Sequence, residues 1–175
     1  MMTNSKDSTR VVIKNNKPRI TGIIIGKYVS LLILIAFIVW LALFQSGSTK
    51  SFEEVSQALQ ESIDDEELVM KGSQEFKKYY GLNSADYEGV LFYTSEFSMS
   101  AKEVLLVEVK NEHQIEQVKN AIDARLEERK NRFEGYEPEQ VQLLDEAAYV
   151  VRGNYIFLAV SPDAEAYRQA FERSL

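Results

Sequence analysis

The sequence predicts an α+β protein, with one N-terminal transmembrane helix followed by an outer domain whose four-stranded antiparallel sheet is covered by helices on one face. Three observations favour this class. A long apolar stretch lies near the amino terminus, helical and strand patterns fill the remainder, and Gly153-Asn154 joins two apolar runs as a hairpin turn. The predicted divisions are a basic cytoplasmic tail at 1–19, a transmembrane helix at 20–45, a linker at 46–50 and an extracytoplasmic domain at 51–175.

The predicted span rests on the run from Tyr28 to Phe44, which contains no charged residue. As a helix this run rises about 25 Å, slightly less than a hydrocarbon core of about 30 Å. The apolar segment 20–25 extends it, and Lys27 can reach the headgroups along its aliphatic stem. We therefore expect a helix long enough to cross the membrane.

Charge predicts the orientation of this span. Residues 1–27 carry a net charge of +5, whereas residues 46–175 carry −12, within a total of −7. Lys and Arg beside a span tend to stay in the cytoplasm, so we expect a single-pass protein of the cell membrane with its amino terminus inside and its carboxyl-terminal domain outside. An acidic outer domain also argues against a nucleic-acid partner.

A cleavable signal peptide is the competing interpretation, with Ser46 and Ser48 as the small residues before the cut. The apolar run and the leader of 27 residues are both longer than secretion needs, which favours retention. The chain has no cysteine, so it has neither disulfides nor a lipidated cysteine anchor.

The outer domain opens with two helical patterns, at 51–63 and 73–81. Ser51 and Glu54 have capping-box spacing, and Gly81 can end the second helix. The segments 89–97 and 103–110 are rich in β-branched and aromatic residues, which predicts two strands.

A helix is predicted next, from about Glu112 to Glu134, because apolar residues recur along one face and charges along the other. "YEPEQV" then indicates an irregular connection, followed by the hairpin at 147–160 and a last helix from Ser161. Two strand-strand-helix units therefore follow each other, which suggests a duplicated unit.

Residues 79–175 resemble an uncharacterised domain-of-unknown-function family of membrane-anchored proteins and lipoproteins in clostridial Gram-positive bacteria. The resemblance is carried by "YYGLNSADYEGVLFYTSEF", "FEGYEPEQV" and "RGNYIFLAVS". Members are often exported lipoproteins encoded near membrane-bound acyltransferases that modify the envelope. The resemblance thus implies an accessory role beside such a partner, and it supplies no catalytic residue.

The residues themselves give no positive sign of catalysis or of a cofactor. His113 is the single histidine, and no cysteine accompanies it, so we predict no metal site. No glycine-rich phosphate loop, nucleophile elbow or metalloprotease motif is present.

Three classes of function remain open. The first is a membrane-tethered accessory or binding domain of unknown ligand, linked to modification of envelope polymers, with another envelope protein such as a membrane-bound acyltransferase as partner. The second is a carbohydrate-active envelope enzyme, which would need two carboxylates roughly 5 to 9.5 Å apart in a cleft. The third is a structural protein that assembles through its span.

Two sets of residues are candidate contact sites. A basic cluster beside a tyrosine and the hairpin turn predicts a recognition edge, because Arg and Tyr are favoured at protein interfaces. Its residues are Arg125, Arg129, Arg132, Tyr136, Asn154 and Tyr155. The alternative assigns the arginines to pairing with nearby acidic residues. In the span, Gly22, Gly26 and Ser30 place small residues on one helix face, which predicts a homodimer.

Overall fold

The computed structural model describes the backbone of residues 20–44 and 50–175, and the side chains of residues 26–38 and 50–175. The chain divides into two compact units, Met1–Phe44 and Gln45–Leu175. The predicted tail at 1–19 and nearly all of the predicted linker at 46–50 lie outside the described residues.

The first unit contains helix α1, Ile20–Phe44, in which the Ser30 hydroxyl donates to the carbonyl of Lys27 at 3.1 Å. Among the described residues, no helix combines the length and the apolar character needed to cross a membrane. The predicted transmembrane helix is therefore wrong as a span, although the segment is helical. The uncharged run alone is shorter than a hydrocarbon core, and the prediction reached full length only by extending past Lys27.

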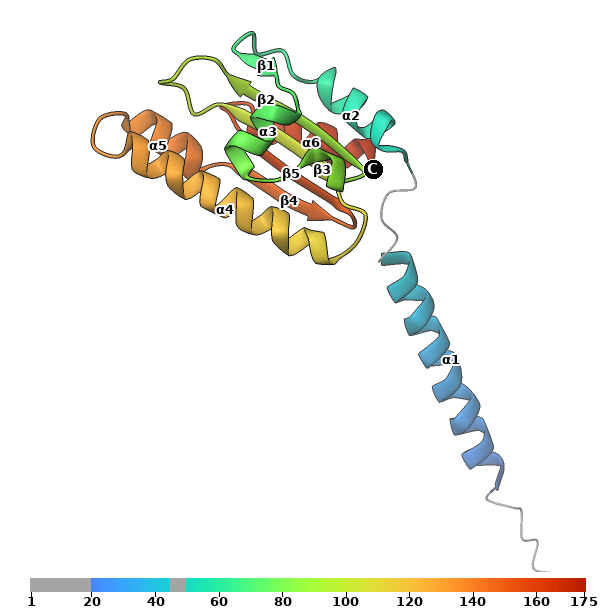
Figure 1. Ribbon diagram of the computed structural model, residues 1–175. Helices are drawn as coiled ribbons and strands as arrows, with labels where there is room; N and C mark the ends of the chain where they lie inside the picture. The colour runs from blue at the N-terminus through green and yellow to red at the C-terminus, as the bar shows by residue number, and fades with distance from the viewer. Residues whose placement is uncertain (1–19, 45–49) are drawn as a thin grey trace, which may run out of the picture. The chain divides into compact units, whose positions relative to one another are not determined.

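The second unit is built on a five-stranded antiparallel sheet with the order β1-β2-β3-β5-β4 (Figure 1). The α+β class is confirmed, but the predicted count of four strands is wrong. The strands are β1 Leu68–Met70, β2 Gly89–Ser95, β3 Glu103–Glu108, β4 Ala148–Arg152 and β5 Tyr155–Val160. The additional strand is β1, which pairs with the end of β2.

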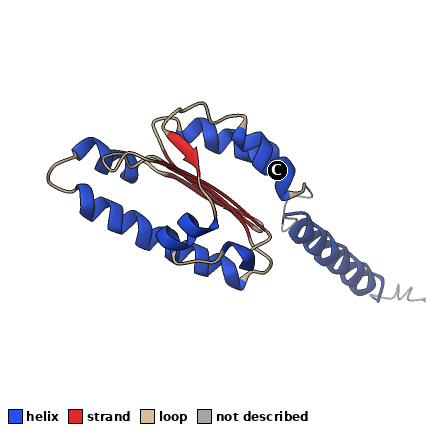
Figure 2. Cartoon of the chain, turned by 45° about the horizontal axis from the view of Figure 1, so that its top comes forward, coloured by secondary structure: helices blue, strands red, loops and turns tan. Residues whose placement is uncertain are grey.

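Helices cover both faces of this sheet, so the prediction that they cover one face is also wrong. Figure 2 shows the sheet edge-on, with helices on either side of it. One layer holds α3 Ser73–Tyr80, α4 His113–Phe133 and α5 Pro138–Asp145, and the other holds α2 Phe52–Gln60 and α6 Ala164–Ser174. A short 3-10 helix, η1 Ser84–Asp86, leads into β2.

Burial of the central strands explains the two layers. Every residue of β3 and β5 is buried. Leu105 and Val107 of β3 enter the core under α3, α4 and α5, while Val104 and Leu106 enter the core under α2 and α6. Because successive side chains of a strand point to opposite faces, a strand that is apolar throughout needs cover on both.

Local signals position the ends of several elements as expected. The Ser51 hydroxyl accepts from the backbone N–H of Glu54 at 3.4 Å, and the Glu54 carboxylate accepts from the N–H of Ser51 at 3.3 Å, which completes the capping box of α2. Gly153 has φ +57°, a left-handed conformation that suits glycine, and it begins the two-residue turn between β4 and β5.

The two strand-strand-helix units follow the predicted order but are not arranged as a repeat. Their central strands, β3 and β5, are antiparallel neighbours. If the two units were a repeat, a two-fold axis perpendicular to the sheet would relate β3 to β5. Such an axis would place the helix that follows each strand, α4 and α6, on the same face of the sheet. Instead α4 and α6 pack on opposite faces, so the shared order is not a duplicated arrangement.

Candidate functional site: a charged pocket above a buried ion pair

Four polar side chains meet inside the domain and form what we term the buried charge cluster: Tyr80, Glu103, Arg125 and Arg129. Glu103 begins β3, Tyr80 ends α3, and the two arginines lie one turn apart on α4. Their exposed fractions are 3% for Glu103, 4% for Arg125, 7% for Arg129 and 6% for Tyr80. Charged groups at this depth are stable only when they are paired.

Glu103 is the centre of this cluster. Its carboxylate accepts from the Arg125 guanidinium at 2.9 Å and also from the Tyr80 hydroxyl. Burial, reinforced by the charge of Glu103, raises the pKa of Tyr80 well above its usual value, so the phenol stays neutral and keeps donating. Burial alone would lower the pKa of Arg125, but the charge of Glu103 raises it overall.

Arg129 carries the second positive charge of the cluster. Its guanidinium donates to the carbonyl of Ser100, which belongs to the hairpin between β2 and β3, and it lies 4.9 Å from the centre of the Phe133 ring. Its Nε is buried and has no hydrogen-bond partner among the described residues. Burial and then the nearby charge of Arg125 lower the pKa of Arg129. The cluster therefore fixes the β2–β3 hairpin to α4.

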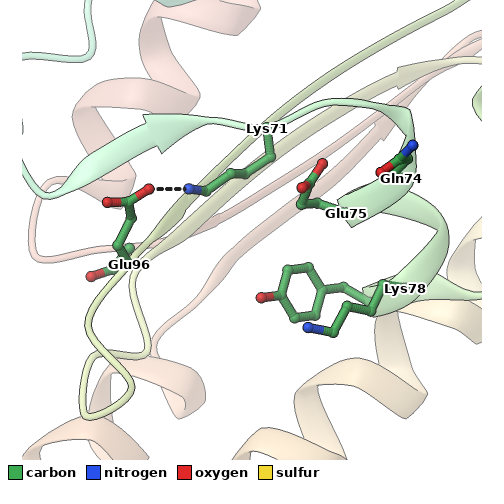
Figure 3. Close-up of a pocket in the computed structure, with 7 residues that line it drawn as sticks. Lys71, Gln74, Glu75, Lys78 and Glu96 are labelled. Carbon is green, nitrogen blue, oxygen red and sulfur yellow. Dashed lines mark hydrogen bonds and ion pairs between the residues drawn. The ribbon is translucent and has the colours of Figure 1, made fainter.

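A polar pocket of about 400 Å³ lies beside this cluster (Figure 3). It is lined by Lys71, Gln74, Glu75, Lys78, Tyr79, Ser95 and Glu96. Tyr79 connects the two features, because its ring centre lies 4.4 Å from the Arg125 guanidinium carbon and 5.3 Å from the Lys78 ammonium. The pocket wall thus rests directly on the buried ion pair.

Charges of both signs line the pocket. Lys71 reaches across to Glu96 at 2.7 Å, as Figure 3 shows, and this hydrogen bond lowers the pKa of Glu96. Within the described part of the chain, Lys78 and Glu75 form no ion pair with another residue. These two groups are accordingly available to a ligand.

Apolar side chains are exposed near the same pocket. Val69 and Met70 of β1 are 38% and 50% exposed, and Phe97 and Met99 of the β2–β3 hairpin are 65% and 50% exposed. Val69 and Met70 are consecutive in β1 and point to opposite faces of the sheet, and Met70 shares the face of Leu68 and Tyr93 toward α2 and α6. We call Val69, Phe97 and Met99 the hairpin patch. Outside α1, the other large apolar side chains exposed in the described residues are Met70 and Tyr136. Exposed apolar groups gathered in one region are typical of an interaction surface.

The structure divides the predicted recognition edge. Arg125 and Arg129 are buried together, whereas Arg132 is exposed and pairs with Glu128 at 2.6 Å. Tyr136 is 54% exposed beyond the end of α4. These four residues belong to α4 and the loop that follows it, near the start of β3.

Asn154 and Tyr155 lie at the other end of β3. Asn154 donates to Glu108 at 2.6 Å, and the Tyr155 hydroxyl donates to the carbonyl of Lys50 at 3.3 Å. Since Tyr155 pairs with Glu108 and Val160 pairs with Glu103, the two ends are about 17 Å apart along the strand. The hairpin turn is therefore not brought to the arginines.

The predicted self-association residues lie in α1. Gly22 falls outside the described side chains. Gly26 has open space where a Cβ would be, and Ser30 bonds only to its own helix among the described residues. Self-association through this face stays a prediction.

The sequence patterns assign no site role to Glu103, Tyr79 or Tyr80. They predict Glu103 at the start of a strand and the two tyrosines at the end of a short helix. A charged residue opening an otherwise apolar strand is the one available signal, because an unpaired carboxylate is rarely buried. Among the described residues, no group of three or more His, Cys, Asp or Glu side chains could hold a metal ion.

Comparison with known proteins assigns the chain to a family but gives it no activity. No curated protein and no solved structure matches it. Residues 61–161, more than half of the chain, match the family described as a domain of unknown function, DUF4358. The matched segment includes all five strands, the pocket and the buried charge cluster. The chain belongs to the DUF4358 family of domains of unknown function.

Proposed function

We propose that the unit Gln45–Leu175 is a binding domain that recognises a partner protein through the hairpin patch and the adjoining pocket. The observation that carries this proposal is the gathering of exposed apolar side chains beside a charged pocket at one edge of the sheet. Methionine and aromatic residues are enriched at protein interfaces, and the charges of Lys78 and Glu75 would provide specificity at the rim.

The buried charge cluster supports this proposal by holding the surface in place. Arg129 binds the hairpin through the carbonyl of Ser100, and Arg125 supports the pocket wall through Tyr79. A surface that is already ordered loses less conformational entropy on binding, which increases affinity. As partner we propose another envelope protein, such as a membrane-bound acyltransferase; this part rests on the family resemblance alone.

Site-specific photocrosslinking in living cells tests the proposal. A photoreactive amino acid at Phe97, in the full chain, should crosslink to one partner protein. The same group at Gln169, an exposed position on α6, should not. Lys78→Glu should reduce the crosslink from position 97 at least about threefold, a loss of roughly 0.7 kcal/mol in binding. Identical products from positions 97 and 169, or a crosslink indifferent to Lys78→Glu, would refute the proposal.

A further inference from the structure

Strand β4 is the last strand of the sheet, so one of its edges has no neighbouring strand among the described residues. It pairs with β5 on one side. On its other side, no hydrogen bond from another described segment reaches its backbone. Unpaired backbone groups along a strand edge form a template for another strand.

This edge also lacks most of the features that usually prevent such pairing, apart from the charge of Arg152 at its end. Its sequence, "AYVVR", contains no proline, glycine or lysine, and its register with β5 runs one residue to one residue without a bulge. The opposite edge, β1, has only three residues. From these observations we propose that β4 pairs antiparallel with β4 of a second copy of this chain, which joins two sheets into one.

The backbone pattern fixes the register of this pairing. Residues of an antiparallel strand alternately direct their N–H and C=O groups to one side and to the other. Arg152 and Tyr155 flank a two-residue turn and bond to each other, so Val151 and Tyr149 direct their backbone groups away from β5. A two-fold axis at Val150 places each Tyr149 opposite Val151 of the second copy, where both pairs exchange hydrogen bonds.

Side chains match in the same register. Tyr149 opposite Val151 is an aromatic and β-branched pair, a favourable cross-strand combination. Val150 lies opposite Val150 of the second copy, on the face that packs against α2 and α6. Arg152 lies opposite Ala148 of the second copy and keeps its own partner, Glu172, at 3.3 Å, so the pairing leaves no charge without a partner.

Engineered cysteines test the register directly, because the natural chain has none. Val150→Cys in the full chain places the two thiols opposite each other across the axis. Their Cα atoms would be about 4.5 Å apart, within the range of a disulfide. We expect mild oxidation to convert most of this variant to a covalent dimer. Ala148→Cys is the matched control, because its two copies lie about 13 Å apart in this register.

The loss of one edge hydrogen bond gives a second measurement of the same pairing. Val151→Pro removes a backbone N–H that points away from β5, so it should make the full chain monomeric in light scattering while the bonds between β4 and β5 stay intact. Phe97→Ser in the hairpin patch should leave the dimer unchanged. A monomeric natural chain, a disulfide from Ala148→Cys in place of Val150→Cys, or a dimer that Val151→Pro leaves unchanged would overturn the proposal.

Discussion

Replacing Arg125 by methionine removes one member of the buried ion pair while keeping most of the aliphatic stem. The Glu103 carboxylate, 3% exposed, then keeps only the Tyr80 hydroxyl as a partner. Removing one partner of a buried pair typically costs about 3–5 kcal/mol, because the remaining charge is neither paired nor hydrated. For a domain of this size that loss lowers the thermal midpoint by roughly 10–20 °C.

Arg132→Met is the matched control. Arg132 lies on the same helix and pairs with Glu128 at 2.6 Å, but its side chain is 50% exposed. Such an exposed pair contributes at most about 1 kcal/mol, so the midpoint should fall by no more than about 4 °C. Thermal unfolding followed by circular dichroism measures both variants.

A double variant separates two contributions to the loss of stability: the uncompensated charge of Glu103 and the lost packing of Arg125. Adding Glu103→Gln to Arg125→Met removes the uncompensated carboxylate, so the double variant should be more stable than the sum of the single effects predicts. The coupling should reach at least about 2 kcal/mol. Equal losses for Arg125→Met and Arg132→Met, or strictly additive single effects, would refute the view that burial makes this pair essential.

Two further variants test other parts of the fold. Gly89→Ala should destabilise the domain by about 1–3 kcal/mol in chemical denaturation, because a Cβ there would lie 2.2 Å from the Phe52 ring; Phe52→Ala in the same chain should remove part of that cost. Tyr149→Phe should abolish a tyrosine that titrates near pH 12 in ultraviolet absorbance, since burial raises the pKa of Tyr149 from 10.0 to about 12. Because the folded-state pKa is the higher one, the natural chain should lose this contribution to stability as pH rises from 10 to 12, and the variant should not. A variant with the same alkaline profile as the natural chain would contradict the assignment.

Strong local signals predicted much of the fold. The capping box of Ser51, the glycine at position 81 and the Gly153-Asn154 turn each required one backbone conformation, and each is confirmed. Strand β1 was missed because three residues are too few to show alternation. The irregular connection predicted from "YEPEQV" is wrong, because helix α5 begins there at Pro138, and proline is common in the first turn of a helix.

Cover on both faces of the sheet could have been predicted. "VLLVEV" is apolar on both sides of the strand through Val107, which indicates burial on two faces rather than one. The buried charge cluster could not have been predicted in the same way. Glu103 is separated from Tyr80 and Arg125 by more than twenty residues on either side, and no period of helix or strand connects them.

Strands β3 and β5 pair directly although almost fifty residues separate them in the sequence. Each of the two hydrophobic cores combines side chains from before α4 with side chains from after it, so the domain should unfold as one cooperative unit. The amide hydrogens of β3 are bonded to neighbours on both sides and covered by two helical layers. They should exchange with deuterium only through global unfolding, whereas β1 should exchange by local opening. The slowest amides of this protein would therefore report the stability of the whole domain without any denaturant.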